Sequence, residues 1–303
     1  IFYMFIFLCA EITAVAMLIN YISKVPLWIT SVLVMTTTLV YTLYGGLKAS
    51  ILTDNFQFLI VVILLSVCMY TIFTSDFISY EDFTNSSSNL LSSKYIPNYT
   101  AGFTFFIAVA ATNLFHQGNW QRVFAAKNYE VLNKSLKLSF LIIIPIVFFM
   151  GITGIIAISV DSQINPDLAF FSILLKDKSE FLYIAIIILA ISLTVSTVDT
   201  LVNAISSLII VDGKKINKKI KSPNILIIFL STIAFFIASK GFSILYLFLL
   251  ADLLCCAAVF PVFYGFYQRK FSETNAINSI LVGLFLGLLI FPSPDFSKSI
   301  LIG

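Results

Sequence analysis

Long, uninterrupted apolar runs dominate this chain and decide what it can fold into. Nine runs can be delimited, and each is apolar around most of a helical circumference. A membrane-spanning helix needs about 20 apolar residues, whereas a barrel strand needs only about 9–11. In hydrocarbon only helices and closed barrels satisfy the backbone. We therefore expect an all-α, polytopic membrane helix bundle with spans at 1–22, 27–45, 55–75, 102–117, 138–160, 182–211, 224–239, 242–267 and 276–292.

Composition excludes the main soluble classes of protein. Charged residues make up 11% of the 303 residues and hydrophobic residues 59%, whereas an average soluble domain carries about 25% charge. These values exclude a soluble globular domain, a disordered chain and a nucleic-acid-binding protein. The expected molecule is one transmembrane domain, residues 1–303, whose partner is a lipid bilayer.

Basic residues divide unequally between the two sets of alternating loops, and this predicts the orientation. The opposite set of loops contains the longest connection, a polar outer loop at 76–101. Because loops rich in Lys and Arg stay in the cytoplasm, we expect a multi-pass protein of the cell membrane with its basic loops inside. Twelve of the 18 basic residues lie in this predicted cytoplasmic set: Lys48, Arg122, Lys127, Lys134, Lys137, Lys214, Lys215, Lys218, Lys219, Lys221, Arg269 and Lys270.

Polar side chains inside the apolar runs are the strongest candidates for function, because burying them without partners is costly. Glu11, Asp199, Asn203 and Asp252 lie within spans, and we assign them a role in ion binding or gating. The run at 182–211 is the densest in such residues. Its hydroxyls and carboxylate form an all-oxygen set, which suits a small hard cation. Its polar members are Ser192, Thr194, Ser196, Thr197, Asp199, Thr200, Asn203, Ser206 and Ser207.

A polar interruption at 113–122 breaks another apolar run. Asn113, His116 and Gln117 precede Gly118, which can relieve the backbone there. Discontinuous helices form substrate sites in secondary transporters, so we expect these three side chains to meet a neutral or hydrogen-bonding solute. His116 is the only histidine, and no nucleophile triad, phosphate loop or histidine pair accompanies it. We therefore expect no enzyme activity, no cofactor and no transition metal.

Three stretches resemble the solute:sodium symporter family, which includes proline, pantothenate, sugar and iodide carriers. The first is Tyr41-Thr42-Leu43-Tyr44-Gly45-Gly46-Leu47-Lys48-Ala49, followed by Thr53-Asp54 and Gln57. The second is Ser196-Thr197-Val198-Asp199-Thr200 with Asn203 and Ser206-Ser207. The third is Trp120-Gln121-Arg122 with Ala125-Ala126-Lys127.

The resemblance implies the inverted-repeat transporter fold (LeuT type) and a set of sodium-binding residues. It implies hydroxyl ligands from Ser196 and Thr197, a backbone carbonyl ligand from Leu193, and Asp54 on the path of sodium near the cytoplasm. On this alignment the nine spans begin at the third core helix. We therefore expect a fragment that lacks the first two core helices, and Ile1 does begin inside an apolar run.

Three functions remain open from the sequence. The first is sodium-coupled symport of a small organic solute by alternating access, with Na⁺ as the coupling ion. The second is a transporter-like sensor module of a signalling protein. The third is proton-coupled symport with Asp199 or Asp252 as the proton carrier.

Overall fold

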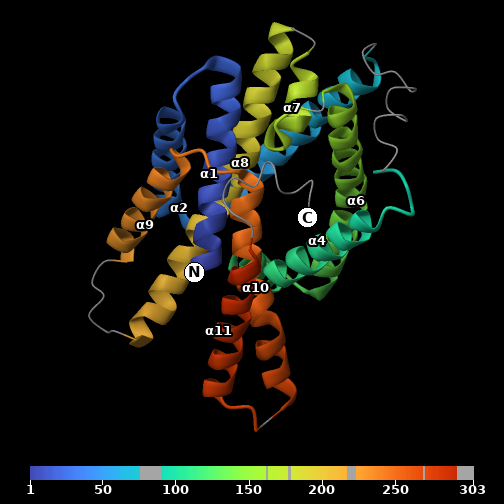
Figure 1. Ribbon diagram of the computed structural model, residues 1–303. Helices are drawn as coiled ribbons and strands as arrows, with labels where there is room; N and C mark the ends of the chain where they lie inside the picture. The colour runs from blue at the N-terminus through green and yellow to red at the C-terminus, as the bar shows by residue number, and fades with distance from the viewer. Residues whose placement is uncertain (76–89, 162, 177–178, 217–222, 269, 292–303) are drawn as a thin grey trace.

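The protein is a bundle of helices, which confirms the expected all-α class (Figure 1). The computed structural model describes residues 1–75, 90–161, 163–176, 179–216, 223–268 and 270–291, and no strand occurs among them. Most of the predicted outer loop, 76–89, lies outside the described residues, as do Lys218, Lys219, Lys221 and Arg269. The elements are α1 Phe2–Ser23, α2 Leu27–Phe73, α4 Ile96–Phe115, α5 Gln117–Ala125, α6 Tyr129–Val160, η1 Pro166–Leu168, α7 Ala169–Leu174, α8 Glu180–Ile216, α9 Pro223–Ala238, α10 Ile244–Tyr267 and α11 Glu273–Ile290.

Five of the described helices are long and apolar enough to cross a membrane, which identifies a polytopic membrane bundle. They are α1, α2, α6, α10 and the Glu180–Asp212 part of α8. Two shorter apolar helices, Ile225–Ala238 and Glu273–Leu289, accompany them. The count of nine spans, the inverted repeat and the cytoplasmic face remain predictions.

Helix α2 consists of two helical arms that meet at Gly46, directly after the predicted end of the first span, and it differs from the prediction in the connection that follows. The sequence predicts two spans, 27–45 and 55–75, with a polar connection between them, whereas the structure continues in helical conformation up to Phe73. The direction changes at Gly46 alone, where φ is 55° and ψ is −149°. A residue with a Cβ is strained in this region of backbone space. One glycine therefore replaces the expected loop.

The predicted interruption at 113–122 is present as a sharp break between two helices. Helix α4 ends at Phe115 and α5 begins at Gln117, with His116 extended between them at φ −73° and ψ 99°. The short elements η1 and α7 were not expected, because they are too short to produce a periodic pattern. Asp167 of η1 accepts hydrogen bonds from the backbone N–H groups of Ile244 (3.1 Å) and Leu245 (3.3 Å), and so holds the start of α10.

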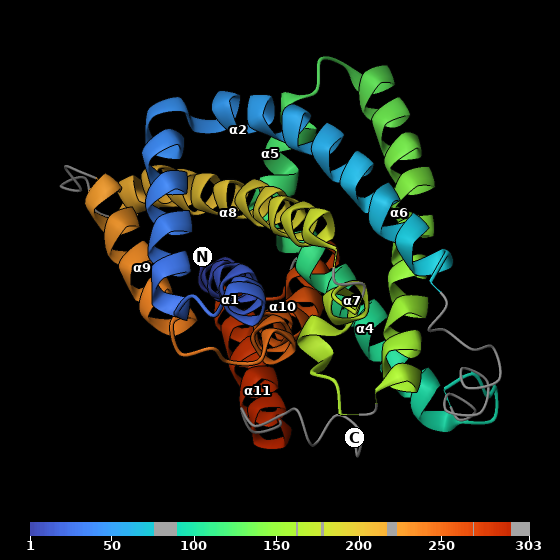
Figure 2. The ribbon, with the colours of Figure 1, turned by 90° about the horizontal axis from the view of Figure 1, so that it is seen from above.

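Helix α1 is surrounded by four other helices. Seen from above, it lies within the ring formed by α2, α8, α9 and α10 (Figure 2), and it contacts all four. Ten of its 22 residues are buried. A helix that is apolar on all sides is suited to such a central position.

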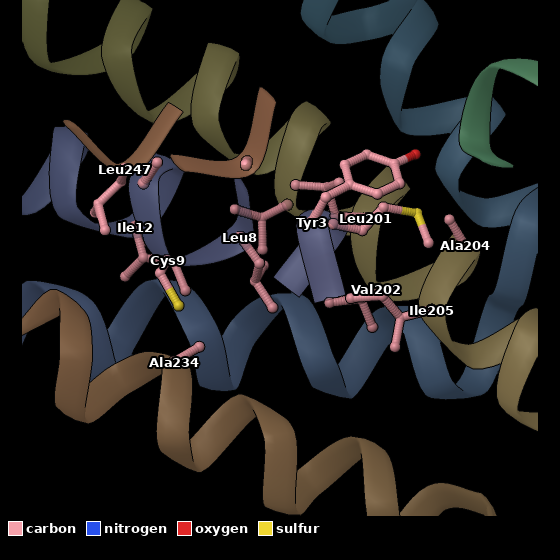
Figure 3. Close-up of a cluster of buried hydrophobic side chains, with 14 of the residues drawn as sticks. Tyr3, Leu8, Cys9, Ile12, Leu201, Val202, Ala204, Ile205, Ala234 and Leu247 are labelled. Carbon is pink, nitrogen blue, oxygen red and sulfur yellow. The ribbon is translucent and has the colours of Figure 1, made fainter. Parts of the chain in front are cut away.

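Two apolar clusters hold α1 against α8. The first joins the beginning of α1 to α8 after Val198, and Figure 3 shows Leu8 and Cys9 with Val202, Ala234 and Leu247. The second joins the later part of α1 to α8 around 186–190, and also includes α7 and parts of α2 and α6. Close packing rather than the hydrophobic effect stabilises helix contacts inside a bilayer. The polar stretch of α8 at 192–197 lies where the two clusters meet.

Candidate functional site

The bend at Gly46 brings both arms of α2 onto one carboxylate of α8. Tyr41, before the bend, donates its hydroxyl to Oδ2 of Asp199 at 2.8 Å. Ser50, after the bend, donates to Oδ1 of Asp199 at 2.8 Å. Thr53 lies 3.3 Å from Oδ2, but its single proton has closer acceptors in the carbonyl oxygens of Ser50 and Ala49. Asp199 therefore joins two hydroxyls of α2, those of Tyr41 and Ser50, to α8.

Asp199 is 0% exposed, and its hydrogen bonds compensate for that burial. The hydroxyl of Thr200 lies 3.3 Å from Oδ1, but its proton has a closer acceptor in the carbonyl oxygen of Ser196 at 2.8 Å. An ionised carboxylate only accepts hydrogen bonds, and bonds to a charged acceptor are about twice as strong as neutral ones. The two short hydroxyl donors, one on each carboxylate oxygen, match this requirement. Asp199 thus holds α2 and α8 together.

A second carboxylate, Asp54, joins α2, α5 and α8. Its Oδ1 accepts a hydrogen bond from Oγ of Ser196 at 2.6 Å. Its Oδ2 pairs with Nη2 of Arg122 at 2.5 Å, and this is an ion pair. The same Nη2 donates to Oγ1 of Thr200 at 2.7 Å. The side chains of Arg122 and Asp54 are 33% and 22% exposed, so the pair lies at the edge of the packed interior.

The expected sodium-binding residues lie together in the structure. Oγ1 of Thr197 donates to the carbonyl oxygen of Leu193 at 3.1 Å, one turn earlier on α8. Ser196 lies beside Thr197 and contacts Asp54. Ser196 donates its single proton to Asp54, so the lone pairs of its oxygen remain free to face a cation. Three of the four expected residues thus share one turn of α8, and the fourth, Asp54, contacts that turn through Ser196.

Side chains satisfy the backbone at the helix break. The carbonyl oxygen of Leu114 accepts a bond from Nε1 of Trp120 at 2.8 Å. The carbonyl oxygen of Phe115 accepts a bond from the hydroxyl of Tyr3 on α1 at 2.5 Å. Nδ1 of His116 accepts from the N–H of Asn119 at 3.3 Å and caps α5. Helix ends buried in a membrane need such partners.

The expected substrate residues all lie at this break. Asn113 accepts a bond from Nδ2 of Asn119 at 2.9 Å, and its own amide donates to Val109 at 2.8 Å. His116 is the residue between the helices, and Gln117 begins α5. Gly118, which was expected to relieve the backbone, serves a different purpose. A Cβ added there would lie 2.5 Å from Cγ2 of Thr200, so glycine permits α5 to approach α8.

Two further expected residues lie outside the α2–α5–α8 network. Asp252 of α10 is buried, and Oγ1 of Thr112 on α4 donates to its Oδ1 at 2.5 Å. Glu11 lies half-buried in the middle of α1. Within the described part of the chain, no hydrogen bond or ion pair joins either residue to Asp54 or Asp199. The described residues contain no group of three His, Cys, Asp or Glu side chains that would hold a metal ion.

Sequence reasoning overlooked several members of the network. Tyr41 and Ser50 belong to or follow the first motif, but nothing in their spacing indicates Asp199 as their partner. Arg122 belongs both to the predicted cytoplasmic charges and to the third motif, but neither indicates Asp54 as its partner. Four buried polar atoms in the described residues find no partner, and all belong to α2, α5 and α8. They are Oγ1 of Thr42, Oε1 of Gln57, Oε1 of Gln121 and Nδ2 of Asn203, the fourth expected ion or gating residue.

Removing the hydroxyl of Tyr3 is expected to weaken the helix break. The Tyr3→Phe substitution leaves the carbonyl of Phe115 without a partner, which costs about 1–3 kcal/mol for a buried group. We expect a lower melting temperature of the purified full-length protein in detergent. Tyr99→Phe is the matched control, because the exposed hydroxyl of Tyr99 also donates to a carbonyl, that of Ser93. Equal melting temperatures of the two variants would contradict the prediction.

Comparison with known proteins gives one curated relative to report. The chain is 27% identical over 294 residues to a protein of Candida albicans named spermidine transporter DUR31. The match covers 95% of this chain and 56% of the relative, so the chain spans about half of that protein's length. No protein-family model matches the chain. No solved structure matches it either.

Proposed function

We propose that this chain functions in the sodium-coupled transport of a small organic solute, by alternating access. The observation that carries the proposal is the group of oxygens from Leu193, Ser196 and Thr197 beside Asp54, in the middle of a long apolar helix. Oxygen atoms of this kind are the ligands that a small hard cation prefers. The similarity to a named transporter supports the same class of function.

The Arg122–Asp54 pair connects cation binding to the position of α5. In this conformation Arg122 neutralises Asp54, while Asp54 orients the hydroxyl of Ser196. A cation beside Ser196 and Thr197 competes with the Arg122 guanidinium for electrostatic attraction to the Asp54 carboxylate. Cation binding is therefore expected to weaken the contact that holds α5 against α2. In this way the ion shifts the population between two states of the transporter.

The relative makes a polyamine the first solute to test. Spermidine is the solute in that protein's name, and we propose a small organic solute of this kind for the present chain. The expected neutral solute, inferred from Asn113, His116 and Gln117, remains an alternative. We also propose a cell membrane location with the basic loops in the cytoplasm, since the basic residues favour one set of loops.

Proton coupling is a second candidate, favoured by Asp252. This carboxylate is buried, and its one hydroxyl donor among the described residues is Thr112, whereas Asp199 accepts short bonds from both Tyr41 and Ser50. Carboxylates inside membrane helices mark proton relays in pumps and transporters. Uptake that persists without sodium but collapses with the proton gradient would favour this candidate.

Sodium dependence of uptake tests the proposed cation site. In vesicles containing the full-length protein, Ser196→Ala and Thr197→Ala should each raise the sodium concentration for half-maximal spermidine uptake by at least about tenfold, because each removes an oxygen ligand. Thr232→Ala on α9 is the matched control. Its hydroxyl also bonds to the carbonyl one turn earlier, that of Ile228 at 2.8 Å, but it faces outward. Unchanged sodium dependence in both α8 variants would overturn the site.

A further inference from the structure

A row of four aromatic rings lies where α1, α4 and α10 meet. The ring of Phe7 on α1 contacts that of Phe248 on α10, with 4.7 Å between centroids. Phe7 also contacts Tyr3 at 6.3 Å, and Tyr3 contacts His116 at the helix break at 6.4 Å. The faces of aromatic rings attract ammonium groups within about 6 Å. The row thus offers contacts for organic cations.

A carboxylate lies on each side of the Phe7–Phe248 contact. Helices α1 and α10 run in opposite directions, since Tyr3 neighbours Cys255 while Phe7 contacts Phe248. Asp252 is one turn after Phe248, and Glu11 is one turn after Phe7. On antiparallel helices these steps lead in opposite directions. The two carboxylates are therefore separated by two helical turns, about 11 Å along the axes.

Neither carboxylate has a basic partner among the described residues. Asp252 is 7% exposed, Thr112 donates only to its Oδ1, and no described residue donates to its Oδ2. The carboxylate of Glu11, half-buried in the central helix, accepts no hydrogen bond from a described residue. In the described chain the one ion pair, Arg122–Asp54, belongs to the other network. An unpaired charge inside a membrane protein is costly, and so marks a site for a charged ligand.

We propose that the seam between α1, α4 and α10 binds a linear organic polycation, with Glu11 and Asp252 holding separate ammonium groups and the aromatic row contacting the chain between them. The inference rests on the proposed transport of a small organic solute and adds the residues that bind a diamine or polyamine. Two carboxylates without a basic partner among the described residues disfavour an anionic ligand. Because two helical turns separate them, they favour a ligand with two separated positive charges over a ligand with one. The site is distinct from the cation site on α8.

Competition for uptake tests whether two separated charges are recognised. The assay uses full-length protein in vesicles, radiolabelled spermidine, and unlabelled putrescine or propylamine as competitor. The wild type should be inhibited by the diamine at a concentration at least about tenfold lower than by the monoamine, because only the diamine forms two charge-assisted contacts. Glu11→Gln and Asp252→Asn should each raise the KM for spermidine about tenfold and remove the advantage of the diamine.

Two controls separate charge recognition from folding. Glu130→Gln removes an exposed carboxylate in the first turn of α6 and should change neither value. Glu11→Asp and Asp252→Glu keep the charges and should retain the preference for the diamine. All rates are divided by the amount of protein in the vesicles. A preference for the diamine that is lost in both the neutral and the charge-conserving variants would show a packing role and overturn the proposal.

The outcomes also distinguish this site from the proposed function. Unchanged KM values in Glu11→Gln and Asp252→Asn would overturn the polycation site while spermidine uptake itself stands. Equal inhibition of wild-type spermidine uptake by putrescine and propylamine would overturn it and leave solute transport intact. Spermidine uptake that needs Glu11 and Asp252 but not sodium would support the polycation site and contradict sodium coupling.

Discussion

Replacing Asp199 by alanine is expected to reduce the stability of the protein by roughly 3–6 kcal/mol. The substitution removes the acceptor of two short hydrogen bonds, from Tyr41 and Ser50, and each bond to a buried charge contributes about 1.5–3 kcal/mol. The two hydroxyls are left without this partner between α2 and α8. For a chain of this size the melting temperature should fall by roughly 10 °C. Thermal unfolding of the purified full-length protein in detergent measures the effect.

Two comparison variants make the Asp199 prediction specific. Asp161→Ala removes an exposed carboxylate at the end of α6, so its melting temperature should stay close to that of the wild type. Asp199→Asn keeps one acceptor oxygen but adds two donors where donors are already in excess. Its stability should therefore lie between those of the wild type and the alanine variant. A melting temperature of Asp199→Ala equal to that of Asp161→Ala would show that the α2–α8 bonds contribute nothing.

Replacing Gly46 by alanine is expected to be the next most damaging change, because it forces a side chain into a backbone conformation that favours glycine. At φ 55° and ψ −149° the strain is of the order of 1–3 kcal/mol. No atom lies within 4 Å of the added Cβ, so the effect comes from the backbone alone. Relief of this strain requires the bend to open. Opening would draw Tyr41 and Ser50 away from their shared carboxylate and reduce transport as well as stability.

Gly151→Ala on α6 is the matched control for Gly46→Ala. Its added Cβ also meets no atom within 4 Å, and Gly151 lies inside a helix. Alanine in a helix interior is more stable than glycine by about 0.5–1 kcal/mol. The melting temperature should thus rise slightly in Gly151→Ala and fall in Gly46→Ala. A fall of similar size in both variants would contradict a special role for the bend.

The ends of α1 and α10 could be predicted from the sequence to within a few residues. The span predicted at 1–22 is Phe2–Ser23, and the span predicted at 242–267 is Ile244–Tyr267. Their hydrophobic runs are continuous, and each run ends at polar or turn residues. The site could be predicted only in part. Leu193, Ser196 and Thr197 share a turn of one helix, so their proximity follows from helical spacing.

Contacts between segments that are distant along the chain could not be predicted from the sequence. The bonds from Tyr41 to Asp199 and from Arg122 to Asp54 cross 158 and 68 positions of the chain. A hydroxyl or guanidinium has many acceptors of equal chemistry, and a single chain does not indicate which one it meets. The expected loop at 46–54 illustrates the same limit. Two adjacent glycines indicated a turn, but whether it is a loop or a bend within a helix depends on the neighbours against which each arm packs.

The sequence by itself determined that this protein lies in a bilayer, that its fold is all-α, and which polar residues interrupt its apolar runs. Runs of apolar residues require a bilayer and helices, because hydrocarbon leaves the backbone no other partners. The same runs single out the few carboxylates and hydroxyls that interrupt them. Only the tertiary structure decided how these groups divide. Asp199 accepts hydrogen bonds from hydroxyls and Asp54 pairs with Arg122, whereas Glu11 and Asp252 have no basic partner among the described residues and lie on either side of an aromatic contact. The physical reason is that the effect of a buried charge depends on its nearest partners, and packing brings those partners from elsewhere in the chain.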